Sequence, residues 1–159
     1  MKAAVLTVSD GVSAGQREDE SGALLVELLE AEKFDVEHRV VPDERPKIAA
    51  ALRELAQHAR VILTTGGTGV SPRDFTPEAT GSVLDRSVPG IAEAIRADAI
   101  AKTPHGLLGR GVAGVRGHTL IVNLPGSPGG CRDGFALLRP ALRHALELIG
   151  SEQTEHLQT

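Results

Sequence analysis

Short apolar runs alternate along this chain with longer segments whose apolar residues recur at helical spacing. Residues 3–8, 34–41 and 61–63 fit buried strands, and the segments between them carry leucine or isoleucine every three to four positions. Parallel strands that neighbour each other need crossover connections of this kind. The alternation therefore predicts an α/β protein, a single three-layer domain with a mostly parallel sheet between helices.

Residues suited to helix starts stand where these helical segments begin. We expect Ser21 to cap the first long helix and Asp43 to lie at the start of the next, with Pro46 in its first turn. A third helix is expected to begin at Thr76, as its N-cap, and a fourth near Pro89. Residues 103–111 are expected to form a loop.

A short antiparallel segment is expected near the end of the sheet. Residues 112–116 and 119–123 are strand-like runs separated by Gly117 and His118, which is the spacing of a tight hairpin. A long final helix follows, and Pro140 should kink or interrupt it.

The chain of 159 residues fits one domain, which we place at residues 1–150, with residues 151–159 as a frayed tail. The net charge of -4 and the absence of a basic stripe disfavour nucleic-acid binding. Cys131 is the only cysteine and is expected to be a small residue at a helix start. No stretch is apolar enough for a signal peptide or a membrane span, so we expect a cytoplasmic protein without membrane contact.

Polar residues and glycines follow every expected parallel strand, in the segments SDGVSAG, VPDE, TTGGTGVSPRD and NLPGSPGG. Ligands of such sheets bind beyond the carboxyl ends of the strands. The third segment is the richest, because Gly66, Gly67 and Gly69 allow backbone amides to approach phosphate oxygens. An ordinary glycine-rich connection before a capped helix is the alternative.

Three aspartates, Asp10, Asp43 and Asp74, each follow an expected strand, so the fold could bring them to one edge. Carboxylates beside phosphate-binding amides suit Mg²⁺, which takes one or two carboxylates together with water and substrate phosphates. Asp43 as an N-cap and Asp10 as a turn former are the structural alternatives.

Phosphate binding has further candidates in Arg73, Arg110 and Arg132, because guanidinium groups form bidentate contacts with phosphates, although each can equally be a surface residue. Ser127 and Gly129 could add donors at the start of the last helix. Two other candidate sites, a dinucleotide-binding loop and a zinc site, are rejected. Residues 109–114 match GxGxxG but precede a strand, and the six histidines lack zinc-site spacing.

Five ordered motifs, TVSDGVSAGQREDESG, VVPDE, TTGGTGVSPRDFTPEAT, PGIAEAIR and GVRGHTLIVNLPGSPGG, resemble the MogA and MoaB family of molybdenum-cofactor biosynthesis, which includes the G domain of gephyrin. The resemblance implies a molybdopterin-binding α/β fold. For the MogA-like branch it implies molybdopterin adenylyltransferase activity with Mg-ATP. For MoaB-like or scaffold members it implies binding of molybdopterin or a partner without efficient adenylyl transfer.

The resemblance also implies roles for particular residues. Asp43 and Asp74 match the family aspartates implicated in adenylyl transfer, and we assign both to catalysis and to Mg²⁺. The expected contacts to ATP and molybdopterin are Ser9, Asp10, Gly66, Gly67, Thr68, Gly69, Arg73, Pro125, Gly126 and Ser127. Gly11 and Gly109 depart from close relatives, which often carry a bulkier residue and a serine there.

The family pattern implies transfer of AMP from ATP to the terminal phosphate of molybdopterin, with release of pyrophosphate. A homotrimer, or a hexamer for a MoaB-like member, and a molybdate-inserting MoeA-like partner are further expectations. A generic nucleotide phosphohydrolase is the remaining alternative, and the lack of a P-loop lysine argues against it.

Overall fold

The computed structural model describes residues 1–151, so nearly all of the expected tail lies outside the described residues. Along the chain the elements are β1 (Lys2–Val8), α1 (Asp10–Ser13), α2 (Glu20–Ala31), β2 (Asp35–Val41), α3 (Arg45–Leu55), β3 (Val61–Thr65), α4 (Thr76–Val83), β4 (Arg86–Ser87), α5 (Pro89–Lys102), the 3₁₀ helix η1 (Pro104–Leu108), β5 (Ala113–Arg116), β6 (Thr119–Leu124) and α6 (Pro128–Gly150).

The six strands form one sheet in the order β2-β1-β3-β6-β5-β4. The first four are parallel, and β5 and β4 are antiparallel to their neighbours, as expected for a mostly parallel sheet with a short antiparallel segment. The hairpin between β5 and β6 turns at Gly117, whose φ of 57° favours glycine.

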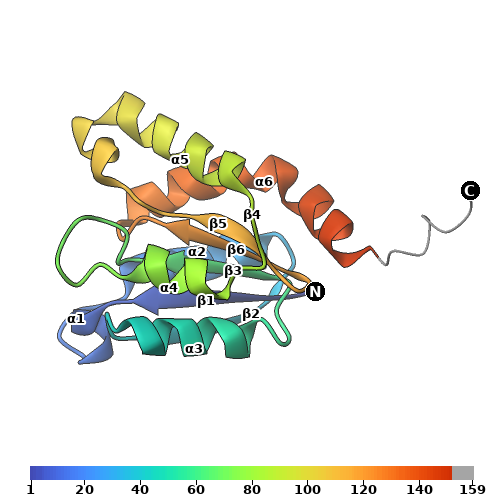
Figure 1. Cartoon of the computed structure of the whole chain (residues 1–159), viewed down its shortest axis with the longest axis horizontal. Helices are drawn as coiled ribbons and strands as arrows, with labels where there is room; N and C mark the ends of the chain where they lie inside the picture. Colours follow the sequence, from blue (N-terminus) through green and yellow to red (C-terminus); the bar gives the residue numbers. More distant parts are fainter. Residues whose placement is uncertain (152–159) are drawn as a thin grey trace, which may run out of the picture.

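Helices cover both faces of the sheet (Figure 1). On one face α2 and α6 pack through Leu25, Leu29 and Leu142 against the buried side chains of the central strands, with α5 contributing partly buried residues. On the other face α3 and α4 pack through residues such as Leu52 and Val83. Alternate residues of β1 enter the two cores, because side chains of a strand point to opposite faces. The three-layer α/β prediction is confirmed.

Several expected boundaries were wrong. Asp19, not Ser21, caps α2, where its carboxylate accepts from the Gly22 amide at 2.9 Å. Glu44, not Asp43, is the N-cap of α3, so capping does not explain Asp43. Thr76 lies one residue inside α4, after the N-cap Phe75. Of these three N-caps only Asp19 makes a side-chain capping hydrogen bond, since Glu44 and Phe75 make none.

Other differences concern short elements and the last helix. The stretch after β1 contains the short helix α1, and neither α1 nor the two-residue β4 was predicted from the sequence. The 3₁₀ helix η1 lies inside the expected loop 103–111. The final helix α6 runs through Pro140 without a break. None of the described helices is long and apolar enough to cross a membrane.

The chain reverses its direction across the sheet between β1 and β3. The connection through α2 places β2 on one side of β1, and the connection through α3 places β3 on the other side. The loops that leave β1 and β3 therefore diverge, which opens a crevice at the carboxyl ends of these strands.

Candidate active site

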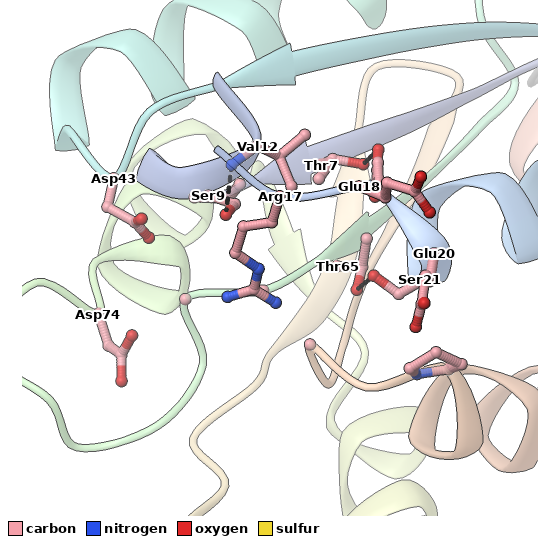
Figure 2. A pocket seen from close by; sticks show the side chains of 16 residues that line it. Thr7, Ser9, Val12, Arg17, Glu18, Glu20, Ser21, Asp43, Thr65 and Asp74 are labelled. Carbon is pink, nitrogen blue, oxygen red and sulfur yellow. Dashed lines mark hydrogen bonds between the residues drawn. The ribbon is translucent and has the colours of Figure 1, made fainter. Parts of the chain in front are cut away.

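A polar cavity of about 270 Å³ occupies this crevice (Figure 2). Loops from four parts of the chain build it, and the starts of α2 and α6 border it. Its lining residues are Thr7, Val8, Ser9, Val12, Arg17, Glu18, Asp19, Glu20, Ser21, Asp43, Thr65, Gly66, Gly67, Asp74, Gly126 and Pro128. Two helix N-termini bring partial positive charge to a cavity with five acidic side chains.

Asp10 and Asp43 hold the first two loops together. The Asp10 amide donates to Asp43 Oδ2 at 2.8 Å, and the Asp43 amide donates to Asp10 Oδ1 at 2.9 Å. Arg73 adds a third loop, because its Nε donates to Asp10 Oδ2 at 2.7 Å and its Nη2 to the Asp43 carbonyl at 3.3 Å. Of the three strand-end aspartates, Asp10 and Asp43 therefore lie together, and Arg73 contacts both.

Ionisation of these carboxyls is shifted in opposite directions. The hydrogen bond from Arg73, followed by that from the Asp43 amide, lowers the pKa of Asp10. Burial raises the pKa of Asp43, and the negative charges of Asp10 and Asp74 raise it further against the opposing hydrogen bond from the Asp10 amide. Asp43 is thus a carboxylate whose charge is only partly compensated by its surroundings.

Asp74 has a local structural role as well as a place in the cavity. Its Oδ2 accepts from the Ser71 amide at 2.9 Å, which closes the turn that precedes α4. A Cβ atom on Gly69 would lie 2.9 Å from the same oxygen, so a side chain at position 69 would displace this carboxylate.

Asp43 and Asp74 are the residues of this cavity that could hold a magnesium ion. Asp43 Oδ1 and Asp74 Oδ1 each make no hydrogen bond within residues 1–151. That part of the chain holds no cluster of three or more potential metal ligands. Two carboxylates without a third protein ligand match the preference of Mg²⁺ for few protein oxygens plus water and phosphates.

The glycine turn after β3 depends on its glycines for two separate reasons. Gly66 and Gly67 have φ angles of 97° and 68°, which side chains rarely adopt. A Cβ on Gly66 would lie 2.2 Å from the Val8 carbonyl oxygen, and one on Gly67 would lie 2.3 Å from Thr76 Oγ1. Thr76 itself donates to the Gly66 carbonyl at 2.9 Å, so the start of α4 fixes the turn.

Arg110 holds the far side of the same loop. Its Nε donates to the Gly69 carbonyl at 2.7 Å, its Nη2 to the Asp74 carbonyl at 2.9 Å, and its backbone amide to the Thr68 carbonyl at 2.8 Å. It also pairs with Glu78, and this hydrogen bond lowers the pKa of Glu78. Arg110 thus positions the loop, and its guanidinium is committed to protein groups.

A second cavity of about 400 Å³ lies beyond the glycine turn, and its lining is mostly apolar. Ile95, Leu108 and Leu124 line it, with Arg96 and Lys102 among its polar residues. Residues 66–69 and 125–130 supply lining to both cavities, and a Cβ on Gly126 would lie 3.4 Å from the Gly66 Cα. The two loops form a common partition between the cavities.

The expected site residues divide among these places. Those that line the polar cavity are Ser9, Asp43, Gly66, Gly67, Asp74 and Gly126. Those that line the second cavity are Thr68, Gly69, Pro125 and Ser127. Asp10 and Arg73 line neither cavity and bind each other instead. Arg132 is exposed and makes no side-chain hydrogen bond within the described chain.

Sequence reasoning missed Arg17, Thr7, Asp19 and Thr65 in the polar cavity. Thr7 and Asp19 form a hydrogen-bonded cluster with His38, in which Thr7 Oγ1 donates to Asp19 at 2.6 Å and His38 Nε2 lies 2.8 Å from the same carboxylate oxygen. Asp19 follows Arg17 in the polar run QREDES, where the sequence offers no signal for which side chain turns inward.

The fold places a polar cavity at the switch point of a mostly parallel sheet, which is where α/β proteins of this class bind their ligands. Residues 4–144 match the family described as "Probable molybdopterin binding domain", and the chain belongs to that family. The expected resemblance is thereby confirmed over most of the chain.

Individual relatives agree with this family. The chain is 41% identical over 133 residues to the molybdopterin adenylyltransferase of Haemophilus influenzae, covering 80% of this chain and 68% of the relative. Among solved structures, the molybdopterin biosynthesis enzyme MoaB of Thermus thermophilus is 49% identical with a TM-score of 0.86, covering 93% of this chain and 95% of that chain. The Mog protein of Mycobacterium ulcerans is 45% identical with a TM-score of 0.89, covering 93% and 98%.

Some relatives are much longer than this chain. The molybdenum cofactor synthesis protein cinnamon of Drosophila melanogaster is 41% identical over 153 residues, which cover 93% of this chain. The chain spans about a quarter of the length of cinnamon, and likewise of the gephyrin of Dictyostelium discoideum.

Proposed function

We propose that this protein is a molybdopterin adenylyltransferase, which transfers AMP from Mg-ATP to the terminal phosphate of molybdopterin. The observation that carries the proposal is the placement of Asp43 and Asp74 in one cavity beside the Gly66 and Gly67 turn. Relatives named molybdopterin adenylyltransferase, at 36 to 41% identity, support it.

In the proposed reaction an oxygen of the molybdopterin phosphate attacks the α-phosphorus of ATP and forms a new P–O bond. The bridging P–O bond between the α- and β-phosphates breaks, and its electron pair leaves with pyrophosphate. No covalent bond to the protein forms, so catalysis rests on positioning and on charge neutralisation. Mg²⁺, when bound, supplies that neutralisation at the phosphates.

The residues of this chain would contribute in distinct ways. Asp43 and Asp74 would hold Mg²⁺ through the oxygens left without hydrogen bonds, and the glycine turn would bring backbone amides close to phosphate oxygens. The larger apolar cavity would take a flat ring system of one substrate, because its lining is largely apolar and lies across the shared partition.

Transfer of label tests the proposal directly. Incubation with molybdopterin, Mg²⁺ and ATP labelled at the α-phosphate should place the label on the pterin and release pyrophosphate. Asp43→Asn and Asp74→Asn should each lower the rate on the order of 10²-fold, by analogy with other preorganised electrostatic groups. A correctly folded Asp74→Asn variant with wild-type turnover would remove the assignment of Asp74.

A pterin-binding protein without efficient transfer is the second candidate, favoured by the 49% identity to MoaB of Thermus thermophilus. Binding of molybdopterin without label transfer would support this candidate. Release of inorganic phosphate from ATP in the absence of pterin would instead support a phosphohydrolase. The oligomeric state, a MoeA-like partner and a cytoplasmic location stay predictions.

A further inference from the structure

Arg17 lies across Gly11 on its way into the polar cavity. A Cβ atom on Gly11 would lie 2.7 Å from both Cγ and Cδ of Arg17, closer than real Cβ contacts come. Gly11 belongs to α1 and does not have a positive φ, so its backbone conformation alone does not require glycine. The missing side chain at position 11 is therefore what leaves room for the stem of Arg17.

The Arg17 guanidinium is the only cationic side chain among the residues that line the polar cavity, into which it points (Figure 2). Within residues 1–151 it makes no ion pair and no side-chain hydrogen bond, although Glu18, Asp43 and Asp74 line the same cavity. Arg73 and Arg110, by contrast, are committed to protein partners. All five N–H donors of Arg17 remain available to a ligand.

We propose that Arg17 binds a phosphate group of a substrate in this cavity, and that Gly11 determines its position. The inference rests on the proposed function and adds a binding residue to it. A guanidinium matches phosphate oxygens in bidentate geometry, and the two helix N-termini at the cavity also favour an anion. The acidic lining by itself would repel phosphate, so Arg17 and a divalent cation together supply the missing positive charge.

Binding measurements on purified variants test this role apart from turnover. Arg17→Gln should weaken binding of the phosphate ligand by about 10- to 100-fold in isothermal titration calorimetry, which is the range of a charge-assisted hydrogen bond. Arg17→Lys should retain part of the affinity, since it keeps the charge and loses the bidentate geometry. Arg53→Gln removes an exposed arginine on α3 and is the matched control, with unchanged binding.

The ligands Mg-ATP, Mg-pyrophosphate and molybdopterin distinguish the source of the phosphate. If Arg17→Gln loses affinity only for Mg-ATP and Mg-pyrophosphate, Arg17 binds the nucleotide phosphates. If it loses affinity only for molybdopterin, Arg17 binds the pterin phosphate. Unchanged affinity for all three ligands in Arg17→Gln would overturn the proposal.

A double-mutant cycle tests the part assigned to Gly11. Gly11→Ala should weaken the same ligand as Arg17→Gln does, and the double variant should bind no more weakly than Arg17→Gln alone, within about twofold. Additive losses would show that Gly11 acts independently of Arg17 and would overturn its positioning role. Thermal unfolding of each variant near the wild-type temperature confirms that the fold persists.

The outcome is separable from that of the proposed function. If Arg17→Gln loses Mg-ATP binding while the wild type transfers no label, adenylyl transfer fails and the role of Arg17 stands. If the wild type transfers label and Arg17→Gln binds all three ligands with unchanged affinity, adenylyl transfer stands and the role of Arg17 fails. A wild type that binds none of the three ligands overturns both.

Discussion

Asp10 and Asp43 each accept a hydrogen bond from the backbone amide of the other, at 2.9 and 2.8 Å. This reciprocal pair joins the loop after β1 to the loop after β2, and it fixes the carboxylate that faces the cavity. Asp10 lines neither cavity, so its contribution is to position Asp43 and Arg73.

Replacing Asp10 should therefore lower activity without removing a ligand contact. Asp10→Ala removes the acceptor for the Asp43 amide and the partner of Arg73, and we expect kcat to fall by about 10-fold or more, since misplaced groups cost rate. Asp10→Asn keeps an acceptor oxygen and should lose less. Wild-type kcat for Asp10→Ala in the adenylyl-transfer assay would contradict this positioning role.

Asp43→Asn should stabilise the ligand-free protein at neutral pH. The folded state holds the proton of Asp43 more tightly than the unfolded chain, so the stability contributed by this group is lost as the pH rises above its ordinary pKa of 3.8. Asparagine does not ionise, so the variant avoids the loss of folding stability that accompanies ionisation of Asp43.

Thermal unfolding at several pH values checks the prediction for Asp43. The variant should exceed the wild type in Tm at pH 7, and the difference should shrink toward pH 4. A lower Tm for Asp43→Asn at pH 7 would show that the carboxylate stabilises the fold.

Gly66→Ala should be strongly destabilising. The new Cβ would meet the Val8 carbonyl, a backbone atom at the end of β1, and the φ of 97° is unfavourable for alanine. A cost of about 2–5 kcal/mol follows from the strained backbone and the overpacking together. Denaturant unfolding measures it.

Gly81→Ala is the matched control for Gly66→Ala. Gly81 lies within α4, and a Cβ there would meet nothing within 4 Å. Helix propensity predicts a gain of about 0.5–1 kcal/mol at this position. Equal effects of the two substitutions would contradict the close approach of the turn to β1.

Cys131 should be unreactive in the folded protein. Burial raises the pKa of its thiol to about 11, and its Sγ contacts the Pro125 carbonyl at 3.1 Å. Ellman's reagent at pH 8 should leave the native protein unmodified and should titrate one thiol after unfolding in guanidinium chloride. Rapid labelling of the native protein would show that the start of α6 opens readily.

The order of strands and helices was predictable because apolar runs and helical periods are local signals, and the glycines of the turn were equally visible. The position of Arg17 was not, because nothing in the run QREDES indicates that its side chain passes over Gly11. Asp10 has a carboxylate that suits a ligand contact, but in the structure this carboxylate binds Arg73. The two-residue β4 has no apolar signal and exists only through its pairing with β5.

The partition made of residues 66–69 and 125–130 makes the two cavities interdependent. A substitution that moves either loop changes the wall of one cavity and, at the same time, the wall of the other. For the same reason, substitutions in this partition that enlarge one cavity for a larger ligand also change the shape of the other cavity. The ligand selectivities of the two cavities therefore change together.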